Sequence, residues 1–278
     1  MIGSQADRTI DAAQSHRSSR WPPEHSALKG VQGVLSDIDD TLTRDGAIEA
    51  VALTALQRLH RAGVPVIAIT GRPMGWSIPF AQAWPVAAIV AENGAVALVP
   101  GAGGTLRTIY VQDVPTRVRN ATRLQQVARR IVAEVTGATL ARDSAGRVTD
   151  IAIDHSEFAH LDEAAIAAVV ALMRAEGMAA TVSSIHINGW FGAHTKWSGA
   201  QWIVPEVTGT PLDAARWIYV GDSTNDQEMF EHFPLSVGVA NLMRFAAQLH
   251  TWPAYLCEGE RGEGFAEVAE ALLAARRG

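Results

Sequence analysis

Apolar runs and helix-periodic segments alternate near the start of the chain. Residues 31–39 and 64–70 are short, nearly continuous apolar runs, which are typical of buried strands. Between them, residues 50–63 carry apolar side chains at helical spacing and end at Gly63, a residue type that commonly terminates helices. Another apolar run, 87–94, follows a short helical segment. This β-α-β order predicts a parallel sheet with helices on its faces.

The pattern changes in the middle of the chain. Residues 117–136 and 161–176 each place apolar residues on one helical face, which predicts two amphipathic helices. Two segments joined by Ser-Ala-Gly at 144–146 predict a β-hairpin, and residues 180–190 predict one further strand. Because this mixture differs from the β-α-β order before it, we predict an inserted α+β domain at 97–190.

The α/β alternation returns after the predicted insertion. The predicted fold class is therefore α/β, a Rossmann-like parallel-sheet core formed by 31–96 and 191–278 that carries the inserted α+β cap. The remaining predicted elements are helices near 195–207, 226–233 and 242–249, strands at 216–222, 235–240 and 254–258, and a C-terminal helix with Phe265, Val268, Ala269, Leu272 and Leu273 on one face.

Composition narrows the possible partners. The formal net charge is −6 and the pI is near 5.8, which argues against nucleic-acid binding. No apolar run reaches the roughly 18 residues of a membrane helix, and Cys257 is the only cysteine, so we expect a cytoplasmic protein without a membrane partner. Residues 1–30 are polar and lack the apolar core of a signal peptide, so we expect a loose N-terminal extension. The oligomeric state stays open.

Chemically reactive residue types concentrate where three predicted parallel strands end. The carboxyl ends of such strands meet at one edge of a sheet, where ligands of α/β proteins bind. A buried carboxylate group is costly unless a cation or another specific partner accompanies it, so a cation is expected here. The three groups are Asp37, Asp39, Asp40 and Thr41; Thr70, Gly71 and Arg72; and Gly221 to Asp226.

These residue types suit phosphoryl transfer. Oxygen ligands from Asp37, Asp39 and Asp222 favour Mg²⁺, which binds few protein oxygens and shares phosphate oxygens. Asp37 is positioned to attack phosphorus, and Asp39, two residues further along, to act as general acid and then base. Thr70 with the amides near Gly71, and Lys196, are the candidates to bind the phosphoryl oxygens.

Each signal also has an ordinary explanation. Asp37 and Asp39 alone would also suit a turn or a helix cap, and Thr70-Gly71 alone would suit a plain strand-to-helix turn. Lys196 alone would be read as a solvated lysine. The joint occurrence, with the motifs in this order and at strand ends, favours a catalytic site.

In these motifs the chain resembles the haloacid dehalogenase superfamily of phosphohydrolases. The matching residues are Asp37–Thr41, Thr70–Arg72, Lys196 and Gly221–Asp226. The insertion between the second and third of these motifs, with Glu92-Asn93-Gly94 just before it, resembles the α+β cap of the Cof-type branch. That branch includes sucrose-phosphate-phosphatase-like enzymes. The resemblance covers about residues 31–278.

The resemblance implies a role for each matching residue. Asp37 becomes nucleophile and metal ligand, Asp39 becomes the acid/base and offers a backbone oxygen to the metal, and Asp222 becomes the third ligand. Phosphate binding is assigned to Asp40, Thr70, Gly71 and Lys196. The orientation of Lys196 or of metal-bound water is assigned to Thr41, Asn225 and Asp226. The substrate candidates are Arg72, Asn93, His186, Asn188 and Trp190.

The substrate candidates have an alternative interpretation. The alternation of Ile185 and Ile187 with polar residues is what any half-buried strand shows, which favours a structural role for His186, Asn188 and Trp190. Around the predicted hairpin, Arg142, Asp143 and Arg147 suit either a second anionic group of the substrate or solvation.

The predicted function is hydrolysis of a small phosphorylated metabolite, a sugar phosphate or phosphorylated glycoside, by a Mg²⁺-dependent phosphatase through an aspartyl-phosphate intermediate. A phosphomutase of the same superfamily is the nearest alternative. A non-catalytic sugar-phosphate sensor is the alternative from another class, and the combination of a nucleophile with an acid/base argues against it.

Overall fold

The computed structural model describes residues 18–277. They form two compact units: unit 1 comprises residues 18–66 and 212–277, and unit 2 comprises residues 67–211. Both units combine helices with sheets, which confirms the predicted α/β class. No helix among the described residues is long and apolar enough to cross a membrane.

Unit 1 is built around a fully parallel sheet. Its strand order is β1-β15-β14-β13-β2, and the strands that carry the carboxylates, β2 and β13, are neighbours with Ser36 opposite Val220. Every residue of β2, β13 and β14 is buried. The strands are β1 (Ser19–Arg20), β2 (Gly33–Ser36), β13 (Trp217–Gly221), β14 (Leu235–Gly238) and β15 (Tyr255–Leu256), with a separate two-stranded sheet of β3 (Thr43–Arg44) and β4 (Ala47–Ile48).

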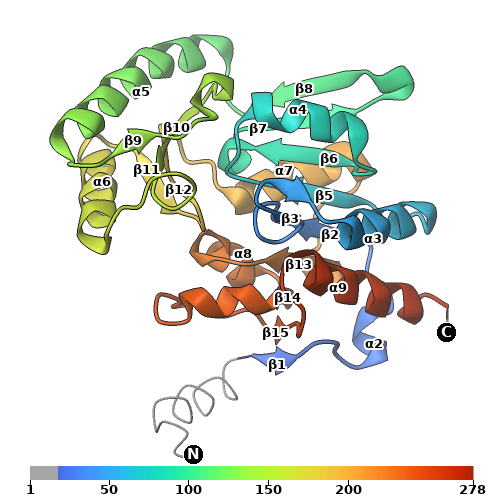
Figure 1. Ribbon diagram of the computed structural model, residues 1–278. Coiled ribbons are helices and arrows are strands. Elements are labelled where there is room, and N and C mark those ends of the chain that lie inside the picture. Colours follow the sequence, from blue (N-terminus) through green and yellow to red (C-terminus); the bar gives the residue numbers. More distant parts are fainter. Residues whose placement is uncertain (1–17, 278) are drawn as a thin grey trace, which may run out of the picture. The chain divides into compact units, whose positions relative to one another are not determined.

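The helices of unit 1 follow the predicted apolar pattern. Helices α3 (Ala50–Arg61) and α9 (Arg261–Ala275) pack against each other (Figure 1). All five residues predicted for the apolar face of α9 are buried. Helix α8 (Gln227–His232) matches its prediction, whereas the helix expected near 242–249 is the 3₁₀ helix η6 (Ala240–Phe245). The other short helices are α2 (His25–Leu28), η4 (Ala214–Arg216) and η5 (Thr224–Asp226).

The expectation of a loose N-terminal extension is wrong for residues 18–30. Strand β1 pairs in parallel with β15, and the amide of Ser19 donates to the carbonyl of Ala254 at 2.8 Å. The Trp21 ring is buried, and its Nε1 donates to the carbonyl of Glu267 at 3.3 Å. Burial of this aromatic ring provides the hydrophobic contact that the polar composition concealed. Residues 1–17 of the predicted extension lie outside the described residues.

Unit 2 contains a four-stranded sheet with the order β5-β6-β7-β8. Strands β5 (Val66–Ile69) and β6 (Ala88–Ala91) are parallel, and β7 (Val96–Pro100) and β8 (Leu106–Tyr110) continue the sheet in antiparallel pairing. Helix α4 (Met74–Ala83) packs on β6 and β7, α7 (Lys196–Thr208) packs on β6, and two 3₁₀ turns, η1 (Glu92–Gly94) and η2 (Ala102–Gly104), connect the strands.

Unit 2 also contains the predicted α+β elements. An antiparallel sheet with the order β11-β12-β10-β9 packs against α5 (Val114–Glu134) and α6 (Glu163–Ala175), whose buried residues include Leu124, Val127, Ile131, Val169 and Met173 (Figure 1). The strands are β9 (Thr139–Leu140), β10 (Asp150–Asp154), β11 (Ala179–Val182) and β12 (His186–Trp190), and η3 (Ser144–Gly146) precedes β10.

The single strand predicted at 180–190 is wrong. The chain turns at 183–185 and forms the antiparallel pair β11 and β12, because the Ser183 hydroxyl accepts from the amide of His186 at 3.0 Å and closes the turn. The predicted limits of the inserted domain, 97 and 190, stay a prediction. In the structure residue 97 lies inside β7, where it pairs with Val90 of β6.

Candidate active site

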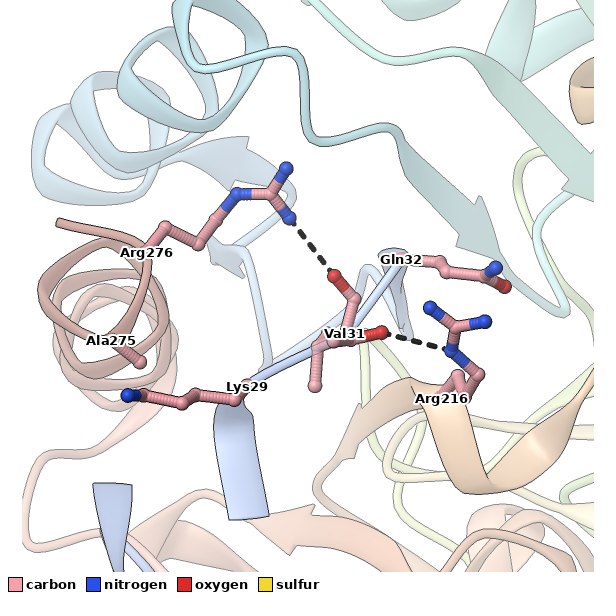
Figure 2. Close-up of a pocket in the computed structure, with 7 residues that line it drawn as sticks. Lys29, Val31, Gln32, Arg216, Ala275 and Arg276 are labelled. Carbon is pink, nitrogen blue, oxygen red and sulfur yellow. Dashed lines mark hydrogen bonds between the residues drawn. The ribbon is translucent and has the colours of Figure 1, made fainter. Parts of the chain in front are cut away.

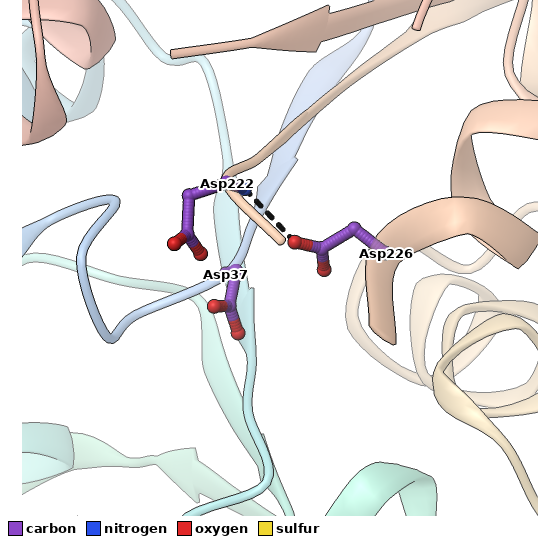
Figure 3. A group of neighbouring side chains, drawn as sticks. All are labelled: Asp37, Asp222 and Asp226. Carbon is purple, nitrogen blue, oxygen red and sulfur yellow. Dashed lines mark hydrogen bonds between the residues drawn. The ribbon is translucent and has the colours of Figure 1, made fainter. Parts of the chain in front are cut away.

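Three buried carboxylates meet at the carboxyl ends of β2 and β13. Asp37 directly follows β2, Asp222 directly follows β13, and Asp226 ends η5 (Figure 3). One carboxylate oxygen from each lies within 4.8 Å of the others, and all three residues are buried. The register of the two parallel strands explains the meeting, because the amide of Asp37 donates to the carbonyl of Val220 at 2.9 Å.

Asp226 accepts hydrogen bonds from three neutral groups. Its Oδ2 accepts from the amides of Asp222 (2.9 Å) and Ser223 (3.1 Å), and its Oδ1 accepts from the Tyr219 hydroxyl. Burial, together with the nearby negative charge of Asp226, raises the pKa of Tyr219 well above its ordinary value, so this hydroxyl stays protonated and donates. Gly221 leaves the necessary room, since a Cβ there would lie 2.6 Å from the Asp226 carboxyl carbon.

Asp222 is oriented by two side chains. Thr41 Oγ1 donates to its Oδ1 at 3.4 Å, and Asn241 Nδ2 donates to its Oδ2 at 3.5 Å. The same Asn241 amide donates to the carbonyl of Asp40 at 2.9 Å. Asn241 was missed in the sequence analysis because it follows β14 as an isolated asparagine with no motif around it.

Asp40 is engaged inside unit 1. Its Oδ1 accepts from Arg261 Nε at 2.6 Å, and its backbone has a φ of 55°, in the left-handed region. A carboxylate paired with arginine does not attract an anion, so any phosphate contact of Asp40 would come from its backbone. Asn225 accepts from the Ser223 hydroxyl at 2.8 Å, and Asp39 is half-buried.

The carboxylate cluster fits a divalent cation. Oxygen donors from Asp37, Asp222 and Asp226 are hard ligands of the kind that Mg²⁺ or Ca²⁺ prefers, and a cation offsets the mutual repulsion of buried carboxylates. The side chain of Asp39 is not in this group among the described residues. That is compatible with the backbone oxygen that the family resemblance assigns to it.

In unit 2 the Thr70-Gly71-Arg72 loop is fixed by hydrogen bonds. Thr70 is fully buried, and its Oγ1 accepts from the amide of Arg72 at 3.0 Å. The carbonyl of Gly71 accepts from Arg147 NH1 at 2.9 Å and from Asn188 Nδ2 at 3.2 Å. Residues of the α+β elements therefore hold the backbone of this motif directly.

The Glu92-Asn93-Gly94 turn joins three segments of unit 2. The buried Glu92 carboxylate accepts from the amides of Met74 (3.0 Å) and Thr149 (2.6 Å). Gly94 has a φ of 104°, and a Cβ there would lie 2.1 Å from the carbonyl oxygen of Thr195, so only glycine fits at this position. Asn93 is buried, and among the described residues its Nδ2 has no hydrogen-bond partner.

Lys196 begins α7 and is 4% exposed. The helix start is well defined, because Thr195 and Ser198 form a reciprocal capping box. The contact between Gly94 and Thr195 places the Glu92–Gly94 turn beside this helix start.

A network of buried charges surrounds Arg72. Its guanidinium pairs with Glu157 at 2.8 Å and Asp143 at 3.2 Å, and Glu157 also accepts from His186 Nε2 at 2.9 Å. Burial opposes ionisation of Glu157, but the hydrogen bonds from His186 and Arg72 outweigh it and lower the pKa of Glu157 to about 2.

Arg147 extends this network. It pairs with Asp150 at 2.8 Å and with Asp143 at 3.2 Å, and its side chain is 2% exposed. Burial raises the pKa of Asp150 to about 7, against the opposing charge of Arg147. Arg147 is therefore not a solvated surface arginine. Arg142, in contrast, is exposed, and its guanidinium carbon lies 3.7 Å from the centroid of the Phe158 ring.

The three substrate candidates on β12 are buried and have structural contacts. Trp190 Nε1 donates to the carbonyl of His194 at 2.9 Å, and the two rings stack with centroids 5.5 Å apart. His186 and Asn188 are bonded to Glu157 and to Gly71 as described above. Their role toward a substrate stays a prediction.

The parallel sheet with carboxylates at its strand ends forms an α/β core that carries a candidate active site. The family model described as haloacid dehalogenase-like hydrolase matches residues 34–117, a segment that includes Asp37–Thr41 and Thr70–Arg72. This match over residues 34–117 confirms the resemblance in the motifs and supports the assignment as an enzyme of the hydrolase type. Hydrolases of this family generally use a divalent metal, and the carboxylate cluster is consistent with that.

Solved structures share the fold at low sequence identity. A protein of Thermoplasma acidophilum is 14% identical to this chain with a TM-score of 0.65, and the alignment covers 87% of this chain and 98% of the Thermoplasma chain. The sucrose-phosphatase of Synechocystis, solved with sucrose and phosphate, is 15% identical with a TM-score of 0.63, covering 88% and 98%. The trehalose-6-phosphate phosphatase of Aspergillus fumigatus is 15% identical with a TM-score of 0.53, covering 94% and 100%. Curated proteins include no match to this chain.

Proposed function

We propose that the protein is a Mg²⁺-dependent phosphatase of a small phosphorylated metabolite, a sugar phosphate or phosphorylated glycoside, that acts in the cytoplasm. The observation that carries the proposal is the buried cluster of Asp37, Asp222 and Asp226 at the ends of two neighbouring parallel strands. The match to a hydrolase family supports hydrolysis, and the phosphatases among the structural neighbours support a phosphate ester as the substrate.

The proposed reaction has two steps. In the first, a carboxylate oxygen of Asp37 attacks phosphorus, the ester P–O bond breaks, and the leaving oxygen takes a proton from Asp39. In the second, a water molecule gives its proton to Asp39 and attacks the aspartyl phosphate, which releases phosphate and restores the Asp37 carboxylate. A bound Mg²⁺, held by Asp37, Asp222 and the backbone of Asp39, would neutralise charge on the phosphoryl oxygens.

The surrounding residues have supporting roles in this proposal. Asp226 fixes the backbone of residues 222–223, and its own carboxylate would orient water bound to the metal. Thr70 and Lys196 would bind phosphoryl oxygens, as the family resemblance implies, and the buried helix start gives Lys196 a defined position. The Asn93 amide, without a partner among the described residues, is the best candidate in unit 2 to donate to a substrate oxygen.

Phosphate release from a panel of compounds tests the proposal. The panel contains sugar phosphates, phosphoglycolate and glycosyl phosphoglycerates, each assayed with Mg²⁺ and with EDTA. We expect Mg²⁺-dependent release from one compound far above the rest. Conversion to an isomeric phosphate without release would instead indicate a phosphomutase, and binding without any turnover would indicate a sensor.

A further inference from the structure

A cationic pocket lies at the other ends of the strands that carry the carboxylates. Its cavity volume is about 650 Å³, and it is open to solvent at the amino-terminal ends of β2 and β13. Among the described residues, no acidic side chain lines it. The lining residues are Lys29, Gly30, Val31, Gln32, Arg216, Ala275 and Arg276.

The cations of this pocket are held by neutral groups. Arg216 Nε donates to the carbonyl of Gly30 at 3.0 Å, and Arg276 NH1 donates to the carbonyl of Val31 at 2.9 Å. Within residues 18–277, none of Lys29, Arg216 and Arg276 forms an ion pair, and all three are exposed. Their positive charges are therefore available to a ligand.

The arrangement is unusual for this chain. The protein carries a net charge of −6, and other arginines of unit 1, such as Arg44 and Arg261, pair with carboxylates. Here three cations from separate segments flank the backbone of residues 29–32 (Figure 2). Like charges repel one another, so this grouping becomes favourable when an anion lies among them.

We propose that this pocket binds a small polyanion with two or more phosphate groups. The guanidinium groups of Arg216 and Arg276 lie on different sides of the segment and Lys29 extends toward Ala275, so a ligand with several negative groups fits better than a single phosphate (Figure 2). Arginine and lysine are the usual side chains that recognise phosphate groups. The pocket lies one strand length from the carboxylate cluster, about 13 Å for the four residues of β2, and is separate from it.

Calorimetric titration of the full-length protein with pyrophosphate tests the proposal. The buffer contains EDTA, so that metal-dependent binding at the carboxylate cluster is suppressed. We expect binding that weakens with added salt, pyrophosphate binding more tightly than orthophosphate, and an affinity loss of about tenfold or more in the triple variant Lys29→Gln, Arg216→Gln, Arg276→Gln. The matched control is Arg61→Gln, Arg129→Gln, Arg174→Gln, which removes three exposed cations elsewhere.

Two further variants make the outcome decisive. Lys29→Gln alone removes no backbone hydrogen bond of the pocket and should weaken binding several-fold in a protein of unchanged stability. Lys196→Gln should retain pyrophosphate binding in EDTA. Equal affinity in the pocket and control triple variants, absence of binding to the unmodified protein, or loss confined to Lys196→Gln would each overturn the proposal.

Discussion

The two units bury charged clusters of opposite design. In unit 1, the carboxylates of Asp37, Asp222 and Asp226 gather within 4.8 Å of one another. In unit 2, Arg72 and Arg147 each lie between two carboxylates at 2.8 to 3.2 Å. A cluster in which opposite charges alternate holds the fold in place, whereas neighbouring carboxylates offer oxygen ligands to a divalent cation.

We expect the two clusters to have different roles, one in holding a loop in position and the other in metal binding and turnover. The unit 2 network reaches the Thr70-Gly71-Arg72 loop through Arg147, which donates to the carbonyl of Gly71. Its charges are therefore expected to determine stability and loop position. The unit 1 cluster is expected to determine metal binding and turnover, and the predictions below test this division.

Arg147→Met should have the largest effect on stability. Removing this buried cation leaves Asp150 and Asp143 without it, which should lower the free energy of unfolding by about 3–5 kcal/mol. Urea denaturation measures the loss. Arg142→Met is the matched control, because Arg142 is exposed and should cost less than about 1 kcal/mol. Similar losses in the two variants would show that the network does not stabilise unit 2.

Mg²⁺ should stabilise the protein through the unit 1 cluster. At a concentration about 100 times the dissociation constant, ligand binding adds about 2.7 kcal/mol, which thermal unfolding detects as a higher midpoint. Asp222→Asn should abolish the shift, because it removes a ligand of the metal. Asp45→Asn, at an exposed aspartate, should keep the full shift. A shift that survives in Asp222→Asn would place the metal elsewhere.

The smallest expected effect is a pH dependence that arises from Glu157. Its pKa of about 2 in the folded protein lies below the ordinary value of 4.5, so its stabilising contribution is complete above pH 4.5 and is lost as the pH falls toward 2. Glu157→Gln should flatten the stability profile in that window, measured by urea denaturation at each pH. Glu231→Gln, at an exposed glutamate, should leave the profile unchanged. Parallel profiles for the unmodified protein and Glu157→Gln would refute the assignment.

Much of the core was predictable because strand burial and helix periodicity are local properties. Strands β2, β5, β6 and β13 and helices α3, α7 and α9 lie where the apolar pattern placed them. The hairpin of β11 and β12 was missed, because its turn uses serine hydroxyl hydrogen bonds without glycine or proline. The packed segment at 18–30 was missed because one buried tryptophan holds it among polar neighbours.

The sequence motifs predicted the acidic residues of the candidate site, but they did not predict the residues that hydrogen-bond or pair with the site residues. The motif order pointed to Asp37 and Asp222, which the structure brings together. Asp226 was expected to orient other groups, and its place in the carboxylate cluster follows from the η5 turn, a local geometry that residue types do not encode. The partners of Arg72 and Arg147 lie up to 85 residues away in sequence, so no local pattern reveals them.

Trapping of the covalent intermediate tests whether Asp37 is the nucleophile. The protein is mixed with Mg²⁺ and the best substrate of the panel, quenched in acid within the first turnover, digested, and analysed by mass spectrometry. The peptide containing Asp37 should gain the mass of one phosphoryl group, and Asp37→Asn should show neither the adduct nor turnover. Normal turnover by Asp37→Asn, or an adduct on another residue, would contradict this role.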